Sequence, residues 1–311
     1  MRIYRLSRPV RRSARPAVIY LPAVAESVEV RRYGSVFNEI ADEYDRHRPA
    51  YPDALIDRAC EVAGLAPAAR VLEIGSGTGQ LTRSLLARGL RVVAVEPGEQ
   101  LIARAREQLA GAGEVQFVNA RLEEASVPRA HYQAVFSASA IHWVDPDASW
   151  RKIADALVDG GTVALVSYFG LEDARTARDQ QPLRASLARI APELAAEWPS
   201  YRDLDATLQG VAQRRGNVSE AWAWLGSYEV AREYVCDLFE NAQLAAMPML
   251  VEQTADALNA VLGTMSFWAR LSPGQRDALC AENHALHERL GRPIRSSMVA
   301  CLVTARRARH T

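Results

Sequence analysis

Apolar residues recur along the chain at two different spacings, and the alternation between them predicts the main elements. From Pro52-Asp53 to Gly64 they fall every three or four residues, which predicts a helix. From Arg70 onward, short unbroken apolar segments alternate with stretches of helical spacing. These predict strands at 71–74, 91–96, 115–118, 132–137 and 162–167, and helices at 81–86, 101–110 and 148–157. The alternation predicts a doubly wound, Rossmann-like α/β core with a mostly parallel sheet covered on both faces.

The segments around this alternation define the expected domain boundaries. Residues 35–170 are expected to form the core, introduced by amino-terminal helices that begin near Ser35. Residues 171–291 are rich in alanine and leucine at mostly helical spacing, which predicts a helical insertion, or lid, that covers the substrate. Residues 292–311 are expected to return to the core as a final edge strand, 298–304, followed by a basic tail.

The first 34 residues differ from the rest in charge. They carry six arginines before Glu26, which is the first acidic residue. We interpret residues 1–34 as a flexible basic extension, or as the product of a start codon assigned too far upstream. A signal peptide is the alternative, because Ala23-Val24-Ala25 resembles a cleavage site, but Pro22 interrupts the apolar stretch.

Composition narrows the class of protein. The 311 residues include 37 basic and 37 acidic side chains, for a net charge of zero, and 49% are hydrophobic. A phosphate-backbone binder needs an excess of basic charge and a membrane span needs ~20 consecutive apolar residues, so neither nucleic acid nor membrane is expected as a partner. Four scattered cysteines indicate a reducing compartment, and a single lysine suggests a GC-rich bacterial source. A cytoplasmic, bacterial protein is therefore expected.

The predicted strand at 71–74 runs directly into a glycine-rich turn, Gly75-Ser76-Gly77-Thr78-Gly79. Such a turn after the first strand lets a ligand approach the backbone closely, as in dinucleotide-binding folds. The third glycine of the dinucleotide pattern would stand at position 80, however, where this chain has Gln80. Glu73 would also repel a pyrophosphate at the helix start, whereas a phosphate-free ligand with an ammonium and a sulfonium would be attracted. A plain strand-to-helix connection is the structural alternative.

A second acidic residue, Glu96, ends the predicted strand at 91–96, about twenty residues after the glycine turn. At this place an acidic side chain accepts hydrogen bonds from the hydroxyls of a ribose. A solvated strand-end carboxylate is the structural alternative. The glycine turn and Glu96 together favour an adenosine-type ligand with a free ribose.

Several motifs resemble those of the class I S-adenosylmethionine-dependent methyltransferases. They are VLEIGSGTG at 71–79, VVAVEP at 92–97, ASAIHWVD at 138–145 and LVDGGT at 157–162. The upstream YDRHRPAYP at 44–52 is similar to a bacterial small-molecule subgroup (methyltransferase type 11/25-like) that includes trans-aconitate-type enzymes. The resemblance implies a mostly parallel, seven-stranded sheet and S-adenosyl-L-methionine as the cofactor.

The resemblance also implies roles for the matching positions. Glu73 and the glycines would hold the methionine end, Glu96 the ribose and Pro97 the edge of the adenine. Asn119-Ala120-Arg121 replaces the family's commoner acidic residue, which leaves the contact to the adenine amino group open. The positions implied to bind the cofactor are Tyr44, Arg48, Glu73, Gly75, Ser76, Gly77, Thr78, Gly79, Glu96, Pro97, Ala120, Arg121, Leu122, Ser137 and Ala138.

His142 is the candidate catalytic residue. It lies just past the fourth predicted strand, where it would deprotonate an acceptor hydroxyl or orient a substrate, and a purely structural role is the alternative. Cys280, His284 and His287 share a helical face with metal-ligand spacing, but no obvious fourth ligand accompanies them, and no metal is expected.

The motifs together predict a methyltransferase that acts on a small, partly apolar metabolite by metal-independent, in-line displacement. The alternatives are an NAD(P)-dependent Rossmann oxidoreductase and a non-catalytic methyltransferase-like binding protein. The identity of the acceptor, the acceptor atom and the choice between monomer and homodimer are left open by the sequence.

Overall fold

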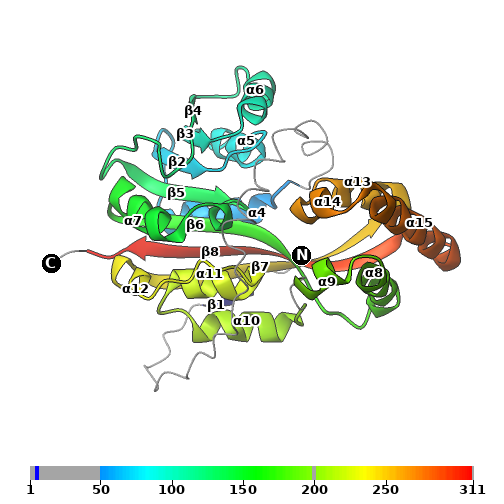
Figure 1. Ribbon diagram of the computed structural model, residues 1–311. Helices are drawn as coiled ribbons and strands as arrows, with labels where there is room; N and C mark the ends of the chain where they lie inside the picture. The colour runs from blue at the N-terminus through cyan, green and yellow to red at the C-terminus, as the bar shows by residue number, and fades with distance from the viewer. Residues whose placement is uncertain (1–3, 7–49, 198–200, 310–311) are drawn as a thin grey trace.

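The computed structural model describes residues 4–6, 50–197 and 201–309 (Figure 1). Tyr44, Arg48 and the helix expected near Ser35 lie outside the described residues. The described residues form one eight-stranded sheet in the order β1-β7-β8-β6-β5-β2-β3-β4. Helices cover both faces of this sheet, which confirms the predicted Rossmann-like α/β fold.

Five neighbouring strands of the sheet run parallel. They are β2 (Arg70–Ile74), β3 (Arg91–Glu96), β4 (Val115–Asn119), β5 (Tyr132–Ala138) and β6 (Leu157–Gly170). Strand β2 lies between β3 and β5, so the order of the strands reverses on either side of it. Ligands of doubly wound folds bind outside the carboxyl ends of the strands at such a switch point.

Side chains of each strand alternate between two cores, one on each face of the sheet. Leu72 and Ile74 belong to the core covered by α7 (Pro146–Ala156), whereas Val71 belongs to the opposite core. The opposite core is covered by α4 (Asp53–Ala63), α5 (Gln80–Leu86) and α6 (Glu99–Gln108). This two-sided burial explains why the strands are nearly continuous apolar runs.

The final strand differs from its prediction. Strand β8 (Ile294–Arg307) was expected at the edge, but it lies between β6 and β7 (Phe239–Gln253) and is antiparallel to both. The sequence carried the signal for this position, because Val299 and Ala300 face opposite cores, as expected of a central strand. Strand β7 was not predicted, because it lies in the segment that was interpreted as helical. It has 15 residues, and its alanines and Pro248 are not typical of a strand.

Two smaller differences concern the ends of the sheet. Residues 4–6, expected in a flexible extension, form β1 (Tyr4–Leu6), which pairs antiparallel with β7 and covers its outer edge. The sequence predicted a helix at 148–157 and a strand that begins at residue 162, with Gly160 and Gly161 between them. Strand β6 instead starts at Leu157 and the glycines lie within an irregularity of its pairing with β5.

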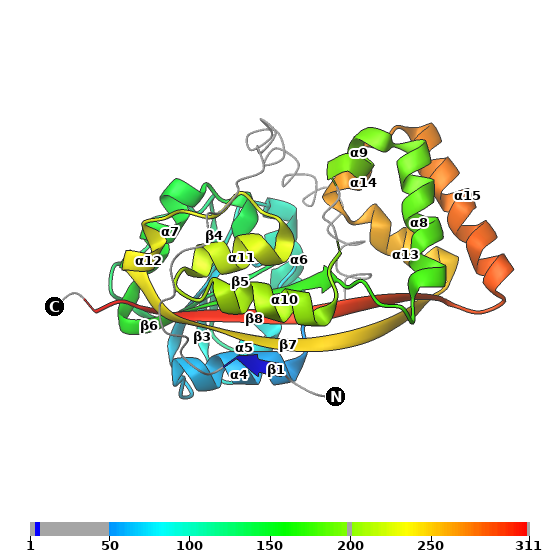
Figure 2. The same cartoon turned by 90° about the horizontal axis from the view of Figure 1, so that it is seen from below.

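The helical segment divides into two groups (Figure 2). One group packs on the sheet and consists of α10 (Leu204–Gln213), α11 (Val218–Gly226) and α12 (Val235–Leu238). The other has its own small cores and consists of α8 (Ala177–Ile190), α9 (Pro192–Glu197), α13 (Ala255–Gly263), α14 (Ser266–Arg270) and α15 (Pro273–Leu290). We call this second group the outer bundle. It sits where the long strands β7 and β8 extend past the rest of the sheet.

Candidate active site

The glycine turn joins β2 to α5 at the carboxyl edge of the sheet. Gly75, Gly77 and Gly79 have φ values of 70°, 54° and 89°, which side chains rarely adopt. A Cβ placed on Gly75 would lie 2.3 Å from the Cβ of Ala140, whereas one on Gly77 would meet nothing within 4 Å. Gly75 is therefore a packing requirement, and Gly77 leaves open space beside the backbone.

Glu73 is a buried carboxyl group at the mouth of this turn. Its Oε2 accepts a 2.7 Å hydrogen bond from Thr82 Oγ1, but its Oε1 is buried and has no hydrogen-bond partner among the described residues. Burial raises the pKa of Glu73 to about 7, with a smaller contribution from the charge of Glu96 and an opposing one from Thr82. Ser76 Oγ is likewise buried without a partner in the described chain. Such groups suit a ligand that brings hydrogen-bond donors, such as an ammonium.

Glu96, the last residue of β3, connects two turns of the site. Its Oε2 accepts a 3.0 Å hydrogen bond from the Gly77 N–H, and its Oε1 accepts one of 2.9 Å from the Gly98 N–H. Burial raises the pKa of Glu96, and the two N–H groups oppose this effect. A carboxylate offers about four acceptor sites, so Glu96 can still accept hydrogen bonds from ribose hydroxyls.

Asn119, the last residue of β4, links β4 to the loop that follows β3. Asn119 donates hydrogen bonds from Nδ2 to the carbonyls of Glu96 (3.1 Å) and Pro97 (3.0 Å), so it fixes the loop that follows β3. Arg121 is exposed and lies 3.5 Å from Glu123 in an ion pair, whereas Leu122 is buried in the core. Asn119 thus has a structural task that the sequence analysis did not assign to it.

A line of hydroxyl groups runs along the ends of β5 and β6. Tyr51 O–H donates to Ser139 Oγ (2.9 Å), and Ser139 Oγ lies 2.7 Å from Ser167 Oγ. Ser139 has a φ of 51°, an uncommon value for a residue other than glycine. Beside this line, Ser137 donates from Oγ to the Ile74 carbonyl (3.1 Å) and so joins β5 to β2. The three hydroxyl residues at 51, 139 and 167 were not singled out from the sequence, because only the fold brings them together.

His142 lies in a short 3₁₀ helix, η2 (Ile141–Trp143), directly after β5. Ala140, which packs on Gly75, precedes it by two residues, so the glycine turn holds the backbone beside η2. The imidazole of His142 stacks on the ring of Tyr228 with centroids 4.1 Å apart and planes 2° apart. Tyr228 belongs to the helical segment and was missed, since no local pattern marks it as a partner of residue 142.

The structure therefore gathers most of the predicted cofactor positions at one edge of the sheet. The glycine turn, Glu73, Glu96 and Ser137 lie at the carboxyl ends of three adjacent strands. In the described ranges, no group of three or more His, Cys, Asp or Glu side chains is arranged to hold a metal. His284 of the metal-like spacing instead lies 3.3 Å from Asp256. No helix in the described part of the chain is both long enough and apolar enough to cross a bilayer.

Comparisons with known proteins agree with this geometry. Residues 71–161 match the family described as a methyltransferase domain. The chain is 33% identical over 195 residues to an uncharacterized methyltransferase of Mycobacterium tuberculosis, covering 57% of this chain and 76% of the relative. It is 28% identical over 156 residues to the ubiquinone/menaquinone biosynthesis C-methyltransferase of Ectopseudomonas mendocina, covering 47% and 61%.

A solved structure shows the same fold. It is a candidate type II methyltransferase from Anaeromyxobacter dehalogenans, with a TM-score of 0.52 at 22% identity, covering 85% of this chain and 99% of that one. The family match includes the glycine turn and Glu96, which are joined by the hydrogen bond from the Gly77 N–H. The chain therefore belongs to the class I S-adenosylmethionine-dependent methyltransferases and is a methyltransferase enzyme.

Proposed function

We propose that the chain binds S-adenosylmethionine between Glu73 and Glu96 and methylates a small, partly apolar metabolite. The observation that carries this proposal is the pair of buried carboxyl groups on either side of an open glycine turn. A phosphate ligand would be repelled by both groups, whereas a ligand with an ammonium, a sulfonium and a ribose matches them in charge and hydrogen bonding. The orphaned Oε1 of Glu73 is the acceptor that this ammonium would satisfy.

In this reaction the protein would bind the cofactor, align the acceptor with the methyl group and remove a proton from the acceptor. Glu73 and Ser76 would bind the methionine end, and Glu96 would bind the ribose and hold the glycine turn in shape through Gly77. S-adenosylmethionine supplies a methyl group on a sulfonium, which already makes that methyl transferable without a metal. The protein then has to align the acceptor with the methyl and exclude water. His142 would take a proton from an acceptor that is a poor nucleophile.

The acceptor is proposed to be small and partly apolar because of what surrounds His142. Tyr228 stacks on its imidazole, and Phe169 lies beside Tyr228; both aromatic side chains are only partly buried, which gives an aromatic environment next to a titratable group. One relative is named as a C-methyltransferase of ubiquinone/menaquinone biosynthesis, which supports a small-molecule acceptor. The four free cysteines support a cytoplasmic location.

The proposal is tested by methyl transfer from deuterium-labelled S-adenosylmethionine to the small-molecule fraction of a bacterial extract, with labelled products detected by mass spectrometry. His142→Ala should lower turnover by roughly 10²–10⁴-fold and leave calorimetric binding of S-adenosylhomocysteine unchanged. His131→Ala is the matched control, because His131 lies at the other end of β5. Full activity in His142→Ala would return this residue to a structural role, and no binding of S-adenosylhomocysteine by the wild type would overturn the proposal.

A further inference from the structure

Tyr228 connects the helical segment to the proposed base. Its ring lies flat against the imidazole of His142, with planes 2° apart and centroids separated by 4.1 Å. A stacked neighbour restrains rotation of an imidazole and leaves the ring edge, where both nitrogens lie, for hydrogen bonding. The rings of Phe169 and Trp222 each have centroids 6.4 Å from that of Tyr228, so two further aromatic side chains lie beside the phenol ring.

The turn after α11 directs Tyr228 toward His142. Helix α11 ends at Gly226, Ser227 follows with a left-handed φ of 55°, and the Tyr228 N–H donates to the Ala223 carbonyl at 3.1 Å. A Cβ added to Gly226 would lie 2.0 Å from the Tyr228 ring. The ring therefore rests directly on the glycine backbone, and a side chain at position 226 would displace it from His142.

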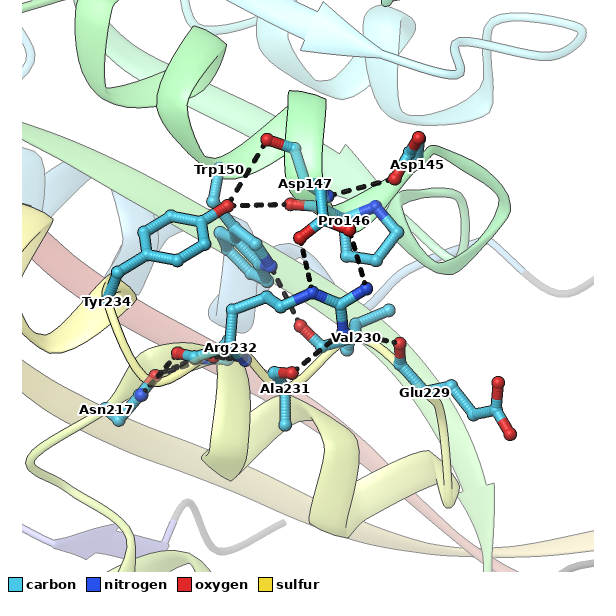
Figure 3. A network of polar contacts seen from close by, with 11 residues as sticks. Asp145, Pro146, Asp147, Trp150, Asn217, Glu229, Val230, Ala231, Arg232 and Tyr234 are labelled. Carbon is cyan, nitrogen blue, oxygen red and sulfur yellow. Dashed lines mark hydrogen bonds and ion pairs between the residues drawn. The ribbon is translucent and has the colours of Figure 1, made fainter. Parts of the chain in front are cut away.

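Hydrogen bonds and an ion pair join the loop that follows Tyr228 to the start of α7 (Figure 3). The Arg232 guanidinium donates two hydrogen bonds to the Asp147 carboxylate, at 2.6 and 3.1 Å. Two more contacts join the same segments: Trp150 Nε1–H to the Val230 carbonyl (2.9 Å) and Tyr234 O–H to the Pro146 carbonyl (3.1 Å). Asp147 follows His142 by only five residues. These contacts therefore hold the segment that carries His142 against the segment that carries Tyr228.

We infer that Tyr228 is the positioning residue of His142, and that the Arg232–Asp147 pair holds it in place. This inference rests on the proposed function, because it assigns Tyr228 a task in orienting the proposed base for the acceptor. Tyr228 fixes the plane of the imidazole, and the helical segment thereby contributes to catalysis without itself touching the reacting atoms.

A spectroscopic test uses the ring current of Tyr228. In the wild type, the Cε1–H proton of His142, assigned by its loss in His142→Ala, should resonate upfield because it lies over the phenol face. Tyr228→Phe keeps the ring and should keep this shift, whereas Tyr228→Leu should lose it. Arg232→Met should move the signal toward the Tyr228→Leu value. Arg129→Met is the control, because it removes an exposed ion pair to Asp155 on the same helix α7.

Activity and cofactor binding separate this inference from the proposed function. Tyr228→Leu should lower kcat by roughly ten- to a hundredfold, with S-adenosylhomocysteine affinity within about twofold of the wild type, and Tyr228→Phe should restore kcat. If the wild type does not bind S-adenosylhomocysteine, the proposed function is wrong. Normal binding, with an unchanged His142 signal in Tyr228→Leu, would overturn the role of Tyr228 alone. An unchanged signal in Arg232→Met would remove the ion pair from the inference.

Discussion

The two carboxyl groups of the site are held in different ways, and this difference sets their expected behaviour. Glu96 has both oxygens engaged by backbone N–H groups, whereas Glu73 has one oxygen on Thr82 and one buried without a partner in the described residues. Hydrogen bonds from N–H groups stabilise the charged form of Glu96, but Glu73 is strongly desolvated. Glu73 is therefore the group whose charge should respond to the cofactor and to pH.

Cofactor affinity should depend on pH through Glu73. Because its folded-state pKa is about 7, the group is mostly protonated at pH 6 and mostly ionised at pH 8. S-adenosylhomocysteine keeps the ammonium of the methionine end, and an ammonium prefers the ionised form of Glu73. It should therefore bind roughly tenfold more weakly at pH 6 than at pH 8. Calorimetric titrations at both pH values measure this ratio. Glu73→Gln should bind weakly and lose the pH dependence, and an unchanged ratio in that variant would exclude Glu73 as its source.

Glu73 should also lower the stability of the ligand-free protein. Its pKa rises from 4.5 to about 7 on folding, so the folded state binds more protons and the contribution of Glu73 falls as pH rises from 4.5 through 7. Glu73→Gln should therefore be more stable than the wild type at pH 8, by up to about 3 kcal/mol, and similar to it near pH 4.5. Urea denaturation of both proteins at the two pH values measures the difference. A Glu73→Gln protein less stable than wild type at pH 8 would contradict the account.

Glu96 should contribute mainly through hydrogen bonds. Glu96→Ala removes the acceptor of the Gly77 and Gly98 N–H groups and the expected acceptor of the ribose, so S-adenosylhomocysteine binding should weaken by roughly 1–3 kcal/mol. Calorimetry measures this loss. Glu99→Ala is the matched control, because Glu99 is exposed in the first turn of α6. Equal affinity in both variants would remove Glu96 from the site.

At the scale of elements, the glycine turn and η2 form one packed unit. Gly75 and Gly77 both have positive φ, but only Gly75 faces a neighbour, Ala140 of the segment that leads to His142. The shape of the turn and the position of η2 are thus linked through the contact between Gly75 and Ala140. This link could not be read from the sequence, because it joins the ends of β2 and β5.

The two glycines offer a matched pair of variants. Gly77→Ala should cost roughly 1–2 kcal/mol of folding stability, the cost of a left-handed alanine. Gly75→Ala carries the same backbone cost and also a Cβ only 2.3 Å from Ala140, so its loss should be clearly larger. Urea denaturation compares the two directly. Equal losses of folding stability in the two variants would show that Ala140 moves aside at no energetic cost, which would contradict the packing role of Gly75.

At the scale of the whole molecule, the outer bundle is joined to the sheet by an ion pair between the buried Asp179 and the partly exposed Arg292. Asp179 of α8 is fully buried and accepts two hydrogen bonds from Arg292 (2.7 and 2.9 Å) and one from the Arg295 N–H (2.6 Å). The Arg292 guanidinium keeps the pKa of Asp179 below its usual value. The hydrogen bonds from the guanidinium and from the backbone N–H offset the cost of burying the Asp179 carboxylate.

Breaking this junction should loosen the bundle before the core. Arg292→Met leaves the buried Asp179 carboxylate without its guanidinium, so stability should fall and hydrogen exchange should accelerate in α8 and α15 more than in β2 and β3. Arg189→Met is the control, because it removes an exposed ion pair to Glu282 between the same two helices and should cost less than about 1 kcal/mol. Uniform acceleration through the sheet would contradict a separate bundle.

The sequence was most informative where one local pattern decides the structure. The alternation of apolar strands and helices predicted the parallel core, and the glycine turn with Glu73 and Glu96 predicted the clustered part of the site. Strand β7 was missed because its alanines carry no strong strand preference and its pairing with β8 is non-local. Tyr228 was missed for a related reason, since its meeting with His142 depends on the turn after α11 and on contacts with α7.

The central claim is that the carboxyl ends of β2 and β3 bind the cofactor. The most direct test is a crystal structure of the full chain grown with saturating S-adenosylhomocysteine. The account predicts the ribose hydroxyls within hydrogen-bond distance of Glu96 and the amino group of the ligand on Oε1 of Glu73, which has no partner among the described residues. Density for the ligand elsewhere, or none at saturating concentration, would contradict it.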